Sequence, residues 1–207
     1  MAESRSGFPA RPSGAPNGAA RGTRDALLDA AYDAAVAGDW ARVRMADVAR
    51  AAGLSRQTLY NEFGSKDALA QALALREVER FIDGTERVLD EAHPAGPIQA
   101  VAAAALSTLQ RAADNPLLKA ALVDDSSGLL SYLTTRGEPA IAAARTSFQN
   151  YYSTHWPHLS PDAIALAADT ITRLTVSYIV LPPDAPAETI AGQFADLARK
   201  LLGEDPS

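Results

Sequence analysis

The stretch that decides the fold is MADVARAAGLSRQTLYNEFGSKD, which spans residues 45–67. Its first part places apolar residues at helical spacing from Met45 to Ala52, so one face of a short helix is apolar. Gly53 is expected to end this helix, because helices often end at a residue with a left-handed backbone, which glycine adopts most easily. Ser55 is a good N-cap for a second helix that begins directly after the break.

The second helix of this stretch, expected over residues 56–63, has an unusually polar outer surface. Leu59 and Phe63 lie four residues apart and point inward. The outward positions carry groups suited to phosphate oxygens and base edges, namely Arg56, Gln57, Thr58, Tyr60 and Asn61. Two short helices joined by a glycine-containing turn are typical of a helix-turn-helix DNA-binding motif. A surface helical hairpin is the alternative explanation of the local pattern.

The same stretch resembles the DNA-binding signature of the TetR family (TetR/AcrR) of one-component transcriptional regulators, and the similarity covers roughly residues 23–75. The matching positions, in order, are Ala46, Asp47, Val48, Ala49, Ala51, Ala52, Gly53, Leu54, Ser55, Thr58, Leu59, Tyr60, Phe63, Ser65, Lys66, Asp67 and Leu69. The sequence departs from the family at Arg44, where members often have a capping threonine. The usual N-cap is therefore in doubt, although an arginine there can reach a phosphate itself.

The resemblance implies an all-α fold with an N-terminal three-helix helix-turn-helix domain and a C-terminal helical bundle for ligand binding and dimerisation. It implies a ligand-responsive regulator, most often a repressor, that binds a palindromic operator as a homodimer. Residues 115–118 with 133–136 are also similar to actinobacterial members linked to fatty-acid, alkane or lactone metabolism. An acyl or lactone compound is therefore the expected effector class.

The predicted DNA contacts lie in the helix-turn-helix and at the start of the helix that follows it. Lys66 is expected in the first turn of a long helix over residues 66–91, where free backbone N–H groups and its ammonium suit a phosphate. The complete predicted set is Arg44, Ser55, Arg56, Gln57, Thr58, Tyr60, Asn61 and Lys66.

Charge and composition agree with a protein that touches DNA at one end. The 207 residues carry a net charge of −6, but residues 1–66 hold nine Lys/Arg against seven Asp/Glu, whereas residues 67–207 hold ten against eighteen. A mildly basic N-terminal part on an acidic remainder fits this arrangement. The chain has no cysteine, which excludes disulfides and thiolate metal sites. Without an apolar signal segment or a membrane-length apolar run, the expected location is the cytoplasm.

Three parts of the chain are expected to differ in organisation. Residues 1–22 are rich in Gly, Pro, Ser and Ala, and are expected to be a disordered arm, either a solvated tail or a DNA-contacting arm. Residues 23–67 form the DNA-binding domain, in which Thr23 is a candidate N-cap and Trp40 a core residue. Residues 68–207 form the ligand-binding and dimerisation domain, whose helices are expected over 98–113, 117–123, 138–155, 162–180 and 187–202.

The last two helices are the candidates for dimerisation. The helix over residues 162–180 is apolar around most of its circumference, as expected when one side packs in its own bundle and the other on a partner. The predicted interface residues are Ile171, Tyr178, Phe194, Leu197 and Leu201.

Aromatic residues scattered over alanine-rich helices predict an apolar cavity for a small-molecule effector. Arg173, in the middle of an apolar helix, is expected to anchor a carboxylate or carbonyl; its alternatives are snorkelling or pairing across the dimer. The predicted ligand-binding residues are Phe81, Tyr132, Phe148, Tyr152, Arg173 and Tyr178.

No catalytic or cofactor motif can be assembled from the sequence. The histidines are His93, His155 and His158, and Pro157 interrupts the helix that would align the last two as metal ligands. The sequence therefore predicts a DNA-binding regulator with neither metal nor cofactor. A transcriptional activator or an architectural DNA-binding protein of the same fold is the alternative, and a helical-bundle enzyme is the alternative of another class.

Overall fold

The computed structural model describes residues 22–38, 40–123, 129–132 and 134–203, and these residues form helices and no strand. The helices are α1 (Thr23–Val36), η1 (Trp40–Arg42), α2 (Met45–Ala51), α3 (Arg56–Phe63), α4 (Lys66–Ala92), η2 (His93–Ala95), α5 (Pro97–Asp114), α6 (Pro116–Val123), η4 (Leu130–Tyr132), α7 (Glu138–His155), α8 (Pro161–Val180) and α9 (Ala187–Leu202). The predicted all-α fold is confirmed. The arm predicted over residues 1–22 lies outside the described residues except for Gly22.

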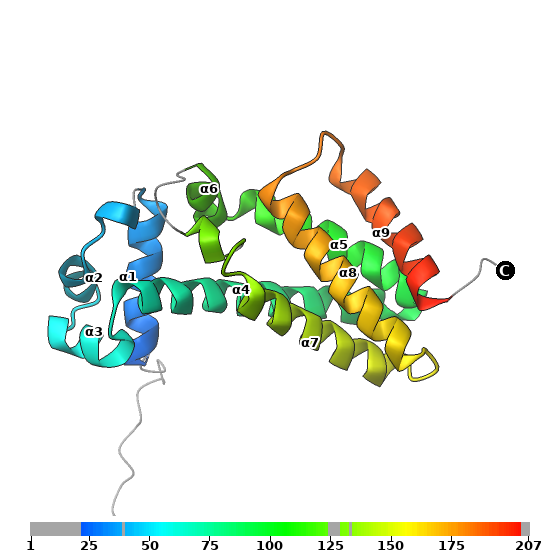
Figure 1. The fold of residues 1–207 in the computed structure, drawn as a ribbon, viewed down its shortest axis with the longest axis horizontal. Helices are drawn as coiled ribbons and strands as arrows, with labels where there is room; N and C mark the ends of the chain where they lie inside the picture. Colours follow the sequence, from blue (N-terminus) through cyan, green and yellow to red (C-terminus); the bar gives the residue numbers. More distant parts are fainter. Residues whose placement is uncertain (1–21, 39, 124–128, 133, 204–207) are drawn as a thin grey trace, which may run out of the picture.

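The first three helices form an N-terminal unit, residues 22–63, at one end of the molecule (Figure 1). Their apolar faces meet around Leu27, Val48 and Leu59, which are fully or almost fully buried. Trp40 is buried in the same cluster, so its interpretation as a core residue is confirmed. The N-cap predicted at Thr23 is wrong: helix α1 already includes Thr23, and the N-cap position belongs to Gly22 without a side-chain hydrogen bond.

Helix α4 runs from the N-terminal unit along the whole of the helical body, residues 66–203 (Figure 1). Its amphipathic pattern buries Leu69 and Leu73 beside the N-terminal unit and Leu89 at its far end. The remaining long helices, α5, α7, α8 and α9, pack around a second core with Val101, Tyr152 and Phe194 at its centre. One helix is therefore shared by the N-terminal unit and the body.

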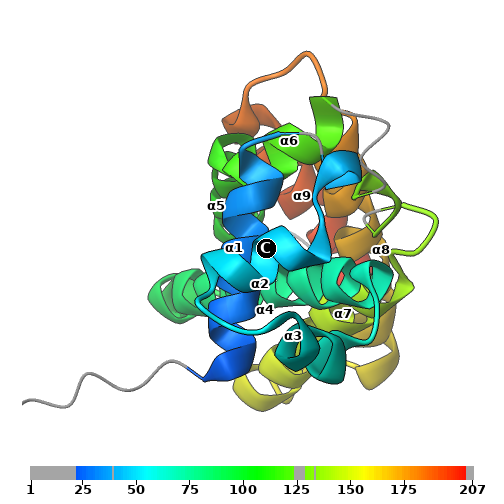
Figure 2. The same ribbon diagram turned by 90° about the vertical axis from the view of Figure 1, so that its left-hand side faces the viewer.

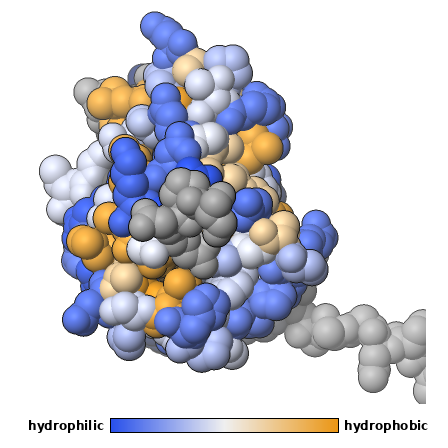
Figure 3. Space-filling model, turned by 90° about the vertical axis from the view of Figure 1, so that its right-hand side faces the viewer, coloured by the Kyte–Doolittle hydropathy of each residue, from blue (hydrophilic) through white to orange (hydrophobic). Residues whose placement is uncertain are grey.

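Helix α8 is long and apolar enough, by length and composition alone, to cross a membrane, although the sequence predicted no such segment. In the structure α8 packs against α5, α7 and α9 of its own chain, and 28% of its apolar window is buried. The end of the body farthest from the N-terminal unit shows apolar patches separated by hydrophilic side chains (Figure 3).

Candidate nucleic-acid interface and effector cavity

Helix α3 is held by its inner face and its first turn. Leu59 and Phe63 are buried against the N-terminal unit, as predicted. The hydroxyl of Ser55 accepts a hydrogen bond from the backbone N–H of Thr58 at 3.0 Å, which confirms Ser55 as the N-cap. The hydroxyl groups of the same two residues lie 2.8 Å apart. These contacts fix the helix start, so the orientation of its outer side chains is set by the fold.

The outer face of α3 is open to solvent. Arg56, Gln57, Tyr60 and Asn61 are exposed and Thr58 is half-buried. The guanidinium carbon of Arg56 lies 5.2 Å from the centre of the Tyr60 ring, so these two side chains stack one turn apart. In Figure 2, which looks onto this end of the molecule, α2 and α3 stand in front. This face therefore presents donors and acceptors, above all the amides of Gln57 and Asn61, that the fold itself does not use.

The turn between α2 and α3 is held by backbone hydrogen bonds. Gly53 has a φ of 70°, in the left-handed region expected from the sequence. The N–H of Gly53 donates to the carbonyl of Arg50 at 3.0 Å, and the N–H of Leu54 donates to the carbonyl of Ala49 at 2.9 Å. This pair of bonds is the Schellman pattern, which satisfies the last carbonyls of α2 and sets the angle to α3.

Arg44 occupies the N-cap position of α2 with an extended backbone and makes no side-chain cap hydrogen bond. The doubt about the usual cap is therefore justified. The Arg44 side chain is exposed beside the first turn of α2, and its contact with a phosphate stays a prediction.

Lys66 lies differently from the free phosphate contact that the sequence suggests. Its ammonium donates to the carbonyl oxygens of Trp40 at 2.6 Å and Ala41 at 2.9 Å. The nitrogen also lies 5.3 Å from the centre of the Trp40 ring. In this structure Lys66 therefore ties η1 to the start of α4, and a phosphate would compete with these carbonyls. The position of η1 depends on tertiary packing, which the local pattern does not reveal.

A polar cluster joins the start of α4 to the segment after α6. The Tyr132 hydroxyl donates to the Asp67 carboxylate at 2.8 Å, and Arg136 Nη1 donates to the same carboxylate at 2.6 Å. Hydrogen bonds from Tyr132 and then Arg136 hold the pKa of Asp67 below its ordinary value. Tyr132, a predicted ligand-binding residue, therefore lies at the junction between the N-terminal unit and the body, and its assignment to the cavity is wrong.

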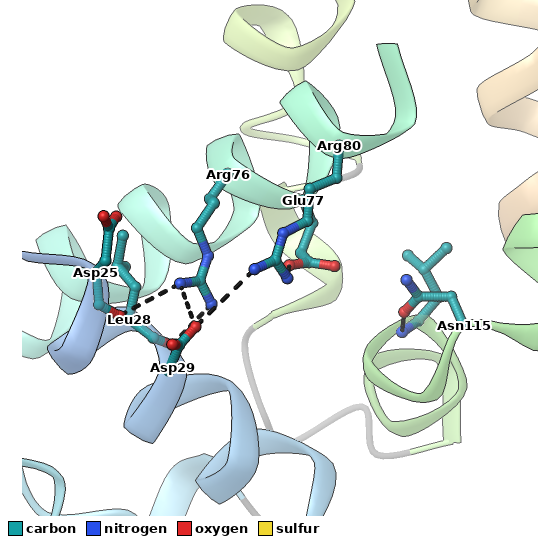
Figure 4. A network of polar contacts seen from close by, with 8 residues as sticks. Asp25, Leu28, Asp29, Arg76, Glu77, Arg80 and Asn115 are labelled. Carbon is teal, nitrogen blue, oxygen red and sulfur yellow. Dashed lines mark hydrogen bonds and ion pairs between the residues drawn. The ribbon is translucent and has the colours of Figure 1, made fainter. Parts of the chain in front are cut away.

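A second polar network joins α1 to α4, as Figure 4 shows. Arg76 donates to the Asp29 carboxylate and to the carbonyl of Leu28, both at 2.9 Å. The next turn of α4 extends the network, because Arg80 donates to Glu77 at 2.7 Å and its second terminal nitrogen lies 3.9 Å from Asp29. The Arg76 side chain is largely buried, so this contact holds the N-terminal unit firmly on α4.

The helical body contains a cavity of about 210 Å³. Its walls come mainly from α4, α5, α7 and α8, with smaller contributions from α6 and the segment before α7. Most of the lining is aliphatic or aromatic, and it includes Phe81 and Phe148 from the predicted set. Alanines at positions 104, 105, 140 and 144 leave the space that longer side chains would fill. The predicted apolar cavity is therefore present.

Three other predicted ligand-binding residues lie outside this cavity. Tyr152 is fully buried, donates to the Pro97 carbonyl at 2.8 Å and stacks on Phe148 at 4.2 Å. Tyr178 packs edge-on against Phe194 at 5.8 Å. Arg173 is on the outer face of α8, where it binds Asp169 at 3.0 Å and lies 3.6 Å from Glu138. These assignments were wrong because an aromatic or charged residue in an apolar helix does not reveal which face of the bundle it occupies.

The predicted dimer residues divide into two groups. Phe194 is 0% exposed and Ile171 lines the cavity, so both side chains pack within their own chain. Tyr178, Leu197 and Leu201 are half-buried at the edge of the body core. Leu166 on α8, which belongs to the apolar circumference of this helix but not to the predicted interface set, is 56% exposed. Inner and outer apolar faces share the same helical spacing, so the sequence alone does not tell which of these residues face outward.

Two polar features near the cavity were not predicted. Thr172 lines the cavity, is 8% exposed and has no hydrogen-bond partner for its hydroxyl within the described part of the chain. Thr85 and Thr108, on α4 and α5, also line it, and their hydroxyl oxygens lie 3.1 Å apart. Threonine carries no sequence signal for such a role, because it is equally common on solvated helix faces.

Histidines gather with aromatic rings at the far end of the body. The rings of His93 and Trp156 lie 5.0 Å apart, and Nδ1 of His155 donates to the Tyr151 carbonyl at 2.8 Å. Among the described residues, no group of three or more His, Cys, Asp or Glu is placed to hold a metal ion.

Comparison with known proteins covers both parts of the chain. Residues 27–73 match the family described as bacterial regulatory proteins, tetR family, and residues 97–200 match the bacterial tetracyclin repressor C-terminal domain. The chain is 36% identical over 164 residues to the HTH-type transcriptional regulator AlkX of Mycobacterium tuberculosis, covering 79% of this chain and 75% of that protein.

Solved structures of other proteins have a similar fold. The crystal structure of the TetR family repressor AlkX from Dietzia sp. strain DQ12-45-1b, a protein implicated in biodegradation of n-alkanes, has 34% identity and a TM-score of 0.72. That similarity covers 86% of this chain and 98% of the Dietzia chain. The structure of RolR in complex with resorcinol has 16% identity and a TM-score of 0.59 over 89% of this chain and 95% of RolR, which is a likeness of fold alone.

Proposed function

This chain belongs to the TetR family of bacterial transcriptional regulators, and from that premise we propose that it is a homodimeric repressor released from a palindromic operator by a small acyl or otherwise apolar effector. The observation that carries the proposal is the coexistence of an anchored helix with an unused polar face, α3, and an apolar cavity in the same chain. The two sites share α4, which follows α3 directly and lines the cavity.

The proposed DNA-reading surface is the outer face of α3. Arg56, Gln57 and Asn61 have the groups that pair with guanine or adenine edges in the major groove. Ser55, Thr58 and Tyr60 are placed around them for phosphate or base contacts, with Arg44 and Lys66 at the flanks. Phosphate contacts would position the protein, and the base contacts would select the sequence.

The proposed dimer brings two such helices to successive major grooves. Dimeric helix-turn-helix proteins place their recognition helices about 34–36 Å apart, and the operator symmetry mirrors that of the protein. The outer face of α8 with the edge of α9 is the proposed partner surface, because it carries exposed Leu166 and half-buried Leu197. The α8–α9 pair also continues into the core, so partner contacts would be rigidly supported.

The proposed effector is apolar or amphipathic because the cavity lining is mostly apolar. The only ionisable side chain that lines it within the described residues is Glu77, an acid already bonded to Arg80. A sugar phosphate would need several cations facing it. The link of the Dietzia relative to n-alkane degradation points to the same class of compound.

The proposed coupling between the cavity and the DNA-reading surface runs through the contacts at the start of α4. Leu129 and Gly137 line the cavity, and the segment between them carries Tyr132 and Arg136, which hold Asp67. An effector that moves this wall favours one conformer of the Asp67 cluster, and DNA and effector affinities are then reciprocally linked.

Selection of bound fragments from random DNA, followed by a fluorescence polarisation titration of effectors on the enriched site, tests this function. We expect a palindromic site and release by acyl or apolar compounds but not by phosphorylated sugars. Binding without sequence preference would favour the architectural alternative. Transcription that rises with the protein present would favour an activator. Release by a sugar phosphate alone would overturn the effector class.

A further inference from the structure

Helix α4 contains Gly84 at the point where the Arg111 side chain of α5 packs against it. A Cβ atom built on Gly84 would lie 1.8 Å from Nη1 of Arg111 and 2.8 Å from its guanidinium carbon. Glycine inside a helix costs about 1 kcal/mol relative to alanine, so Gly84 is not explained by helix stability. Gly84 instead allows the α5 guanidinium to lie flat against α4.

The Arg111 side chain has no carboxylate partner in the described structure. It donates from Nη2 to the Phe81 carbonyl at 3.1 Å and to the Thr85 hydroxyl at 2.7 Å, and its guanidinium carbon lies 5.2 Å from the centre of the Phe81 ring. Burial, followed by the nearby charge of Arg87, lowers the pKa of Arg111. Burial and a neighbouring positive charge both disfavour the charged form of Arg111, and no carboxylate nearby, among the residues that the structure describes, offsets them.

The hydrogen bonds around Thr85 fix the direction of each donor. The Thr85 hydroxyl donates to the Phe81 carbonyl at 2.7 Å and accepts from Arg111. Its proton is therefore used, so in the contact of 3.1 Å with Thr108 the Thr108 hydroxyl is the donor. The oxygen of Thr108 keeps free lone pairs, and its proton can turn from Thr85 to a molecule in the cavity without leaving Thr85 unsatisfied.

We propose that Thr108, with Thr85 and Arg111 behind it, forms the subsite for the polar end of the effector, and that this end is an acyl oxygen of a fatty acid or its ester. A hydrogen bond from Thr108 alone would also allow an alcohol to bind at this subsite. The unpaired charge of Arg111 decides in favour of a group with negative charge or a negative dipole end, because electrostatic attraction is strengthened away from water. This inference rests on the proposed effector function and adds where, and by which chemistry, the effector is oriented.

Arg111 is a positioning residue in this subsite, since it lies behind Thr85 and acts on the effector by the attraction of its charge, without touching it. The test therefore measures discrimination between head groups on one chain length. Octane, octanol, octanoate and methyl octanoate are compared by displacement of N-phenylnaphthylamine from the full-length protein. We expect at least one acyl compound to bind about tenfold tighter than octanol, equivalent to one charge-assisted hydrogen bond. Octanoate and methyl octanoate then distinguish a free acid from an ester.

Two variants remove the charge from the subsite in independent ways. Arg111→Met deletes it, and Gly84→Ala displaces it with a methyl group while favouring the helix. Each is expected to reduce the acyl advantage over octanol to within about twofold, while octane binding is unchanged. Lys200→Met is the control, because that exposed cation lies on α9, which contributes no residue to the cavity lining, and its removal should leave the ratio intact. Thermal melts identify a variant that has lost its fold.

Three results would overturn the inference. Octanol could bind as tightly as both acyl compounds, both variants could retain the acyl advantage, or Thr172→Val could abolish it while Arg111→Met does not. If octanol or octane then still releases the operator, the proposed function stands without this subsite. If no compound of the panel displaces the probe, the effector class of the proposed function fails with it.

Discussion

The hydroxyl of Tyr132 donates to the carboxylate of Asp67 across 2.8 Å, joining residues that lie 65 positions apart in the sequence. The same hydroxyl reaches the Asp67 backbone carbonyl at 2.9 Å. Asp67 is the second residue of α4, only a few residues beyond the end of α3. Tyr132, which lies between the cavity-lining residues Leu129 and Gly137 in the chain, therefore contacts the first turn of α4, shortly after the proposed DNA-reading helix.

Removing this contact should weaken the response to effector more than it weakens the fold. We expect Tyr132→Phe to retain operator binding but to need a higher effector concentration for release, because the hydroxyl that joins the two sites is lost. Fluorescence polarisation of labelled operator against effector measures the shift. An unchanged release curve in Tyr132→Phe and in Arg136→Met would place the coupling elsewhere.

The Asp67 cluster also predicts a pH dependence. The pKa of Asp67 is lower in the folded protein than in the unfolded chain, so its contribution to stability is present above the unfolded pKa and is lost as pH falls through the folded pKa. The difference in melting temperature between the wild type and Asp67→Asn should therefore be present at neutral pH and shrink in acid. Thermal melts across that pH range measure it, and a difference that grows in acid would contradict the assignment.

Gln57 should contribute to sequence selection. Its amide lies exposed on the outer face of α3 and has no packing role, so Gln57→Ala should leave the melting temperature unchanged. The expected loss on the best operator is about 1–3 kcal/mol, with relaxed preference at one base position. Competition between the operator and its single-base variants measures this. Unchanged affinity and unchanged preference would remove Gln57 from the reading surface.

Lys66 should affect every DNA sequence alike. A flexible ammonium suits phosphate oxygens, and in the structure it also ties η1 to α4. We expect Lys66→Ala to weaken all sequences equally, to lower the slope of log affinity against log salt by about one per subunit contact, and to lower the melting temperature. A lower melting temperature with an unchanged salt slope would leave Lys66 with the structural role alone.

The proposed dimer surface can be separated from the fold by choosing an exposed leucine. Leu166 is 56% exposed in the single chain, so Leu166→Asp should leave each subunit folded but bury an unpaired carboxylate at the partner contact. Leu197→Asp should also dissociate the dimer, with some loss of stability, because Leu197 also packs on its own core. Light scattering with circular dichroism measures both effects, and two folded dimers would place the interface elsewhere.

Sequence reasoning succeeded where local chemistry determines the outcome. Ser55 caps the helix expected after it, and Gly53 has the predicted backbone. It failed where a side chain's role depends on which neighbour faces it. Tyr132 and Arg173 have the right chemistry for a ligand site, but the fold gives them carboxylate partners outside the cavity. The Gly84–Arg111 contact joins two helices, and no spacing within either helix indicates it.

The length of α4 relates the size of the cavity to the geometry of DNA. Its 27 residues span about 40 Å at 1.5 Å per residue. Arg76 fastens α1 to this helix, so the N-terminal unit turns with it as one piece. A tilt of about 5° about the far end of such a lever moves its near end by about 3.5 Å, roughly the rise of one base pair. An effector that tilts α4 by that amount would displace the N-terminal unit of each subunit by about one base pair along the operator.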